Sequence, residues 1–136
     1  MDDFRQMINV DELTSDDTVT LARAAAEAIR GLNHATRHQA GLGQPSAAYD
    51  VLGALSLAAS RIGQALAQIT RYLDRALAAG RLGHDPARAV DATTVFLFDA
   101  AASAAALAGD LDAAQQQLAL INGTPRSRTR KERHDR

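Results

Sequence analysis

Apolar residues recur at alternating steps of three and four along two long stretches of this chain. The first repeat comprises Leu52, Leu55, Ala59, Ile62, Leu66, Ile69, Leu73 and Ala76. The second comprises Pro86, Val90, Thr93, Leu97, Ala100, Ala104, Leu107, Leu111, Ala114, Leu118 and Ile121. This spacing places the side chains on one face of an α-helix. Because only the short segment 80–85 separates the two stretches, the pattern predicts two long helices folded back as an antiparallel hairpin.

A shorter helix is predicted ahead of the hairpin. It begins at Thr14 or Ser15, where two aspartates follow and suit the positive end of the helix dipole. It weakens at Gly31, so it is about half as long as either helix of the hairpin. Residues 33–45 are predicted to form a loop, because two glycines and Pro45 interrupt them.

Residues typical of helix ends set the limits of the two long helices. Ser46 can cap the first of them, and Gly80 can end it. Pro86 suits the first turn of the next helix, which is predicted to end at 122–123 because a proline follows. An alternative splits this last helix at Gly109. Since an isolated glycine costs only about 1 kcal/mol in a helix, both alternatives stay open.

A second apolar stripe lies on another face of the last helix. It comprises Val95, Phe98, Ala102 and Ala105. A helix that is apolar nearly all round must be covered on more than one side. The short first helix can cover only part of it, so the stripe is predicted to be a partner interface, with a homodimer as the expected assembly.

These patterns together predict an all-α protein, a long antiparallel helical hairpin with a shorter N-terminal helix, forming a helical bundle completed by dimerisation. The predicted organisation is an acidic segment 1–13, a helical domain 14–123 and a basic, disordered tail 124–136. Alanine accounts for 30 of the 136 residues, so the core is expected to bury little area per residue.

The net charge of −1 conceals an uneven distribution. Residues 124–136 carry a net charge of +4 and the rest carries −5. The tail could contact nucleic-acid phosphates without sequence selectivity. The residues available for such contacts are Arg126, Arg128, Arg130, Lys131 and Arg133. No aromatic side chain accompanies them for base stacking, so nucleic-acid binding is the alternative rather than the favoured function.

Candidate chemistry is weak throughout the chain. The absence of cysteine excludes disulfides and zinc–thiolate sites. His34 and His38 have the spacing of a metal-binding pair, but glycines flank them and no carboxylate follows nearby. Asp99 interrupts an apolar run and is expected either at a solvated helix edge or in an ion pair with Arg71 or Arg75. We therefore expect no catalytic, cofactor-binding or metal-binding residue, and a non-enzymatic protein–protein interaction module (an adaptor, scaffold or regulatory subunit).

Neither a signal peptide nor a confident membrane span is predicted. The N-terminus lacks a basic region followed by an apolar one. The most apolar stretch, 92–108, is short and contains Asp99. A cytoplasmic location without membrane contact is the expectation.

Two segments, 31–36 (GLNHAT) and 49–55 (YDVLGAL), resemble those of small helical actinobacterial proteins of unassigned function. The resemblance covers roughly residues 27–79 and implies no activity, ligand or site. In outline the hairpin is also similar to the small secreted WXG100-type proteins. Their Trp-x-Gly turn is missing here, where the turn is 80–85, so this second similarity does not extend to export.

Overall fold

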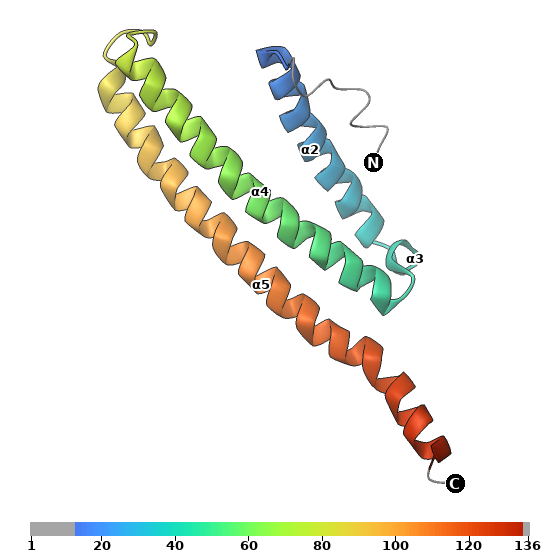
Figure 1. Cartoon of the computed structure of the whole chain (residues 1–136). Helices are drawn as coiled ribbons and strands as arrows, with labels where there is room; N and C mark the ends of the chain where they lie inside the picture. Colours follow the sequence, from blue (N-terminus) through green and yellow to red (C-terminus); the bar gives the residue numbers. More distant parts are fainter. Residues whose placement is uncertain (1–12, 135–136) are drawn as a thin grey trace. The chain divides into compact units, whose positions relative to one another are not determined.

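A computed structural model describes the backbone of residues 13–134 and the side chains of residues 13–121 (Figure 1). This part of the chain contains four helices and no strand, so the predicted all-α hairpin fold is confirmed. The helices are α2 (Ser15–Thr36), α3 (Gln39–Leu42), α4 (Pro45–Ala78) and α5 (Pro86–His134). They belong to two compact units, Met1–Gly43 and Gln44–Arg136, where the sequence predicted one helical domain over 14–123.

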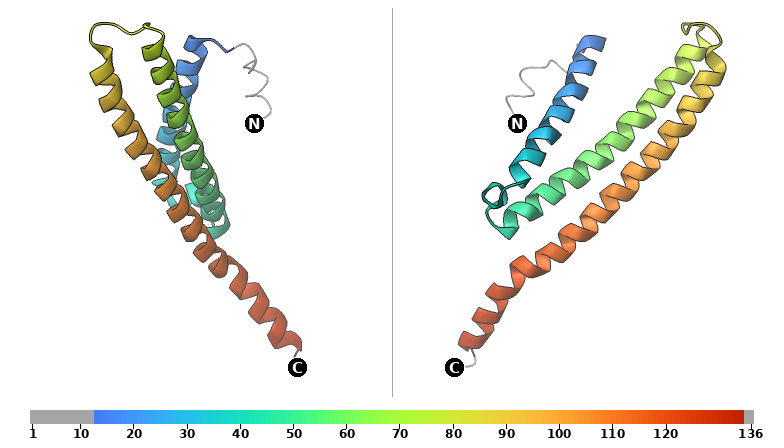
Figure 2. Two further views of the ribbon diagram at one scale, coloured as in Figure 1. Left: turned by 60° about the vertical axis from the view of Figure 1, so that its left-hand side comes forward. Right: turned by 180° about the vertical axis from the view of Figure 1, so that it is seen from behind.

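Helices α4 and α5 run antiparallel and side by side in all three views, joined by the predicted turn (Figures 1 and 2). Gly80 has a positive φ of 68°, and its N–H donates to the carbonyl of Leu77. The N–H of Arg81 donates to the carbonyl of Ala76. These two hydrogen bonds form a Schellman motif, which explains why α4 ends where a glycine can take the left-handed conformation. Helix α5 then begins at Pro86, as predicted.

Two predicted limits of the long helices differ from the structure. Helix α4 begins at Pro45 with Gln44 at its N-cap, so the predicted cap at Ser46 is wrong by two residues. Proline at the first helical position loses no intrahelical hydrogen bond, which makes Pro45 a suitable start.

Helix α5 is continuous through Gly109, so the alternative that splits it there is wrong. Its helical backbone also continues to His134, beyond the predicted end at 122–123. Glycine and proline can both adopt helical φ, and their cost within a helix is a penalty rather than a barrier. The side chains of the predicted basic tail, 124–136, lie outside the described residues.

The N-terminal unit begins with a capping box. The hydroxyl of Thr14 accepts from the N–H of Asp17 at 3.3 Å, and the Asp17 carboxylate accepts from the N–H of Thr14 at 3.0 Å. Helix α2 continues past Gly31 to Thr36, so the predicted weakening at that glycine is wrong. A Cβ atom at Gly31 would meet no other atom within 4 Å, so no close contact depends on the glycine. An isolated glycine weakens a helix but does not by itself end it.

The short helix α3 lies within the segment 33–45 that was predicted to be a loop. A Cβ atom at Gly41 would clash with the carbonyl oxygen of Ala35, so only glycine allows this close approach. The sequence marked the segment as irregular because of its glycines, but the same glycine permits a compact turn of helix.

The seam between α4 and α5 uses smaller residues than the sequence repeats predicted. On α4 it comprises Tyr49, Leu52, Ser56, Ala59, Gly63, Leu66, Thr70 and Leu73, all buried or half-buried. On α5 it comprises Val90, Thr94, Leu97, Ala101, Ala104, Ala108, Leu111, Gln115 and Leu118. Every second member of the predicted repeats is correct, whereas Ile62 (53% exposed) and Leu107 (51% exposed) lie outside the seam.

The physical reason for this shift is close packing of the two helices. A repeat of alternating threes and fours can be completed by either of two neighbouring residues. Hydrophobicity favours Ile62 and Leu107, whereas a close approach of two backbones favours the neighbouring Gly63 and Ala108. The resulting core contains little large apolar surface. Its buried apolar members among the described residues are Ala59, Ala76, Val90, Ala104 and Ala108.

Candidate interaction surface

The two helices of the hairpin leave one apolar flank on each side of the seam. On one side lies the predicted interface stripe, in which Val95 and Phe98 are strongly exposed and Ala102 and Ala105 are also exposed. Phe98 is 74% exposed, an unusual position for a phenylalanine in a helix of this length. We call this side, with the facing residues of α4, the Phe98 flank.

Two hollows lie along the Phe98 flank between α4 and α5. The first, nearer the turn, is walled by Phe98 and Leu97 of α5 and by Ala67 and Arg71 of α4. The second is lined by small residues, namely Ser60, Gly63, Ala101, Ala105, Ala108 and Gly109, with Asp112 at one side. Ala101 belongs to both hollows, so they adjoin. The flank therefore combines large projecting side chains with space that only small side chains line.

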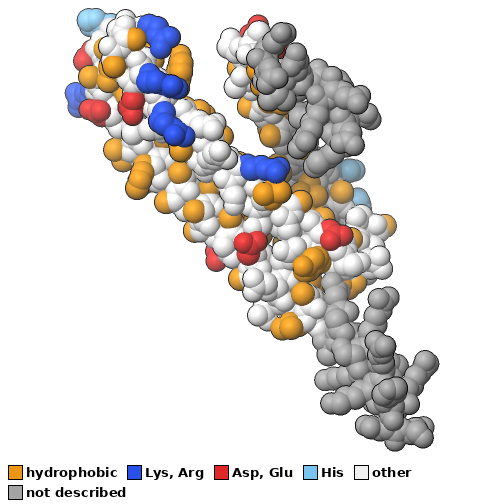
Figure 3. Space-filling model, in the orientation of Figure 1, with side chains coloured by type: hydrophobic (Ala, Val, Ile, Leu, Met, Phe, Trp, Pro, Cys, Tyr) orange, Lys and Arg blue, Asp and Glu red, His pale blue; other side chains and the backbone are white. Residues whose placement is uncertain are grey.

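The opposite side of the seam carries the larger apolar residues of the predicted repeats. We call it the Ile62 flank, because residues one position before the seam, such as Ile62, Ile69 and Leu107, lie there. Phe96, 73% exposed, points to this side, since two residues along a helix correspond to a rotation of about 200° from Phe98. Orange apolar side chains are accordingly spread over the visible surface of the hairpin (Figure 3).

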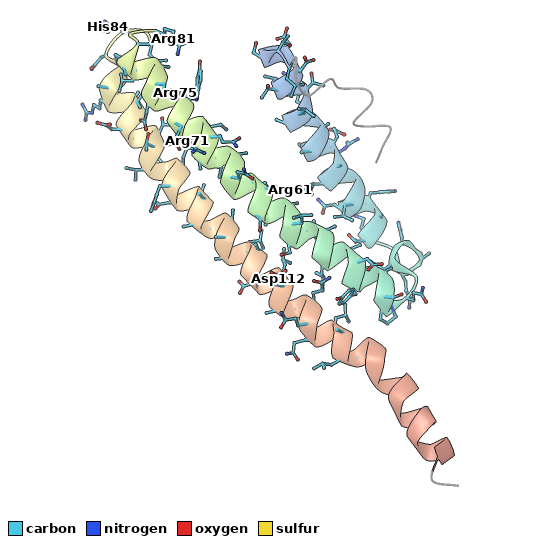
Figure 4. All side chains as sticks on the ribbon, viewed as in Figure 1. Arg61, Arg71, Arg75, Arg81, His84 and Asp112 are labelled. Atoms are coloured by element: carbon cyan, nitrogen blue, oxygen red, sulfur yellow. The ribbon has the colours of Figure 1, made fainter. Side chains whose placement is uncertain are left out.

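Charged side chains are distributed unevenly between the two long helices. Arg61, Arg71 and Arg75 follow α4, whereas Asp112 belongs to α5 (Figure 4). Between Pro86 and Ile121, α5 carries four aspartates against Arg88 alone. Within the described side chains the recorded ion pair joins Arg30 and Glu27 of α2, and none joins α4 to α5. The hairpin is therefore held by packing and by a few hydrogen bonds.

Those hydrogen bonds fix the longitudinal position of the helices. The buried hydroxyl of Ser56 lies 2.6 Å from a carboxylate oxygen of Asp112 and 3.0 Å from the carbonyl oxygen of Ala108. The amide of Gln115 donates to the carbonyl oxygen of Tyr49 at 3.1 Å. These bonds would be lost if α4 slid along α5 by one helical turn.

The candidate chemical residues are not brought together. His34 lies near the end of α2 and His38 precedes α3, with their ring centroids 6.0 Å apart. No group of three or more potential metal ligands occurs within residues 13–121. Asp99 is exposed on α5, as expected for a solvated helix edge.

One helix has a composition that also suits a lipid environment. The segment Pro86–Ile121 of α5 is long enough to cross a membrane and has a mean hydropathy of 1.4 over its most apolar window, of which 11% is buried. Core helices of soluble proteins meet the same criterion, so this property alone is weak evidence for a membrane span. The predicted nucleic-acid contacts, Arg126, Arg128, Arg130, Lys131 and Arg133, lie outside the described side chains.

No protein-family model matches the chain, and comparison with curated proteins and with solved structures gives no match either. The sequence stripe located the projecting side chains of the Phe98 flank but missed the hollows beside them. The signal for the hollows was the spacing of Ser60, Gly63 and Ala67 on α4, which places small residues on one face.

Proposed function

We propose that this protein is a non-enzymatic interaction module whose hairpin self-associates through the Phe98 flank. The observation that carries this proposal is the inversion of the usual distribution of side chains. The hairpin buries alanines and leaves Phe98, Val95 and other large apolar residues exposed. Burial of apolar surface contributes about 25 cal/mol per Å², so an assembly that covers these side chains is favoured over a solvated monomer.

An adaptor, scaffold or regulatory subunit fits this surface better than an enzyme does. Catalysis needs polar or titratable side chains that converge in a protected site. The hollows of the Phe98 flank are instead open and lined mainly by alanine and glycine, and their polar members belong to no cluster of titratable groups. These polar members are Ser60, Thr70, Arg71, Thr94 and Asp112. Such a surface suits the apolar face of another helix, as in helix-in-groove recognition.

The test is a matched pair of aspartate substitutions on opposite flanks. Phe98→Asp would place a charge within the proposed interface, where an unpaired carboxylate is costly. Phe96→Asp changes an equally exposed phenylalanine two residues away on the Ile62 flank. We expect light scattering to give a dimer for the unmodified chain and for Phe96→Asp, and a monomer with unchanged helical circular dichroism for Phe98→Asp.

Two results would contradict the proposal. Dissociation by Phe96→Asp but not by Phe98→Asp would place the interface on the Ile62 flank. An unmodified chain that is monomeric at every concentration and that floats with lipid vesicles would show instead that the apolar surface of α5 contacts membrane.

A further inference from the structure

The outer surface of α4 carries a row of basic and amide side chains. Steps of three and four along one helix face join Arg61, Gln64, Gln68, Arg71 and Arg75, all of which are exposed. We call these five residues the basic row. Figure 4 shows its three arginines along α4, with Arg81 of the turn beyond them, and the basic side chains gather on the same face in Figure 3. The row concentrates positive charge along about 21 Å of helix.

No carboxylate neutralises the basic row within the part of the chain whose side chains are described. Asp74 is the one carboxylate between Arg61 and the end of α4, and it lies outside the row. The recorded ion pair among these side chains joins Arg30 and Glu27 of α2 instead. A guanidinium group binds phosphate oxygens through paired, charge-assisted hydrogen bonds. The basic row is therefore a surface for an anionic partner.

An exposed apolar row runs beside the basic row, one residue further along the chain at each step. It comprises Ile62, Ala65, Ile69 and Tyr72. Ile62, Ile69 and Tyr72 are 53%, 47% and 54% exposed. Because one residue corresponds to a rotation of about 100°, the two rows adjoin on the surface of α4 outside the seam. The sequence repeats placed Ile62 and Ile69 inside the seam, so they gave no reason to expect contact with a membrane.

We propose that these two rows of α4 bind the surface of a lipid bilayer that contains anionic phospholipids. Headgroup phosphates pair with the arginines of the basic row, and the apolar row enters the boundary between headgroups and acyl chains. Adjoining basic and apolar faces are typical of helices that lie along a bilayer surface. Tyr72 suits this boundary, because tyrosine combines an apolar ring with a polar hydroxyl. The inference goes beyond the proposed function and does not require self-association.

The combination of the two rows favours a bilayer over other polyanions. Nucleic-acid phosphates could neutralise the arginines, but they would leave Ile62 and Ile69 in water. An acidic protein would need carboxylates that match an uneven spacing. Along the helix axis Arg61 lies about 15 Å from Arg71, whereas Arg71 lies about 6 Å from Arg75. Lipid headgroups move freely within the bilayer and can adjust to this spacing.

Flotation of the full chain with lipid vesicles tests this inference. The vesicles contain phosphatidylcholine alone or equal parts of phosphatidylcholine and phosphatidylglycerol. We expect binding to the anionic vesicles at low salt, little binding to the neutral ones, and a steady loss as salt rises. Each arginine near an anionic surface raises the affinity about fivefold, so Arg71→Gln/Arg75→Gln should weaken binding about 30-fold. The matched control is Arg23→Gln/Arg88→Gln, which removes the same charge from α2 and α5.

The outcomes separate this inference from self-association, which light scattering measures. Loss of binding in Arg71→Gln/Arg75→Gln, with binding kept by the control and by Phe98→Asp, supports a bilayer on α4. Equal binding to neutral and anionic vesicles, undiminished binding by Arg71→Gln/Arg75→Gln, or loss only through Phe98→Asp would overturn it. A dimer that binds polyglutamate but neither kind of vesicle would assign the basic row to an acidic protein and leave self-association standing. A monomer that binds anionic vesicles through the arginines would contradict self-association alone.

Discussion

Gly63 offers the sharpest test of how α4 and α5 pack, because its substitutions should change the sign of their effect with side-chain size. A Cβ atom at this position would lie 3.8 Å from the carbonyl oxygen of Ala101 and 3.9 Å from the Cβ of Ala104. These are ordinary contact distances, so Gly63→Ala should fit. Alanine in a helix is about 1 kcal/mol more favourable than glycine, and Gly63→Ala should raise the free energy of unfolding by about that amount.

Gly63→Leu should have the opposite effect. Its three additional carbon atoms would crowd Ala101 and Ala104 at the edge of the seam, where the Cβ already touches α5, and such overpacking typically costs about 1–3 kcal/mol. The neighbouring Ile62 is 53% exposed, so Ile62→Ala should cost about 1 kcal/mol rather than the 2–5 kcal/mol typical of a buried isoleucine. The predicted order of stability is therefore Gly63→Ala, then the parent, then Gly63→Leu.

Urea unfolding followed by circular dichroism measures these differences. The variants are compared in the Phe98→Asp background at one protein concentration, so that association does not contribute. Gly109→Ala and Gly109→Leu are the controls, since a Cβ at Gly109 meets nothing within 4 Å. Equal stability of Gly63→Leu and Gly63→Ala, together with a loss of several kcal/mol in Ile62→Ala, would refute the observed seam and support the register of the sequence repeats.

Two further predictions concern the hydrogen bonds of the seam and the C-terminal segment. Ser56→Ala should lower the free energy of unfolding by about 1 kcal/mol, because its buried hydroxyl bonds to α5, whereas the exposed Ser60→Ala should change it little; equal effects in urea unfolding would contradict this role of Ser56. The full chain should not bind duplex DNA at low salt in a fluorescence anisotropy titration; binding that falls steeply with salt and disappears on deletion of residues 124–136 would support the nucleic-acid alternative instead.

The sequence was sufficient to predict the hairpin, its turn and the start of the first helix. The periodicity of Leu52, Leu66 and Leu97 requires a helical face, and Gly80 with Pro86 ends one helix and begins the next. These features depend on residues that act locally, so a single sequence reveals them. The alternate seam positions could not be predicted in this way. Whether Ile62 or Gly63 faces α5 depends on how closely two backbones approach, which is a property of the folded pair.

The candidate surface was predictable only in part. The exposed stripe from Val95 to Ala105 follows from helical spacing alone, and the structure places it beside the seam. The hollows need residues from both helices, Ser60 and Gly63 with Ala101 and Gly109, and their juxtaposition depends on the register of the hairpin. The tendency of glycine and proline to end a helix was overestimated for a related reason. Gly31 and Gly123 carry local penalties of about 1 kcal/mol, which continuation of a long helix can offset.

The concentration dependence of thermal unfolding tests most directly the claim that the hairpin is completed by a second copy. For a dimer that unfolds to separate chains, each tenfold rise in protein concentration adds about 1.4 kcal/mol per dimer. The account predicts that the midpoint followed by circular dichroism rises by a few degrees for each tenfold increase in concentration, and that Phe98→Asp abolishes this rise. A midpoint that is the same at all concentrations for the unmodified chain would contradict it.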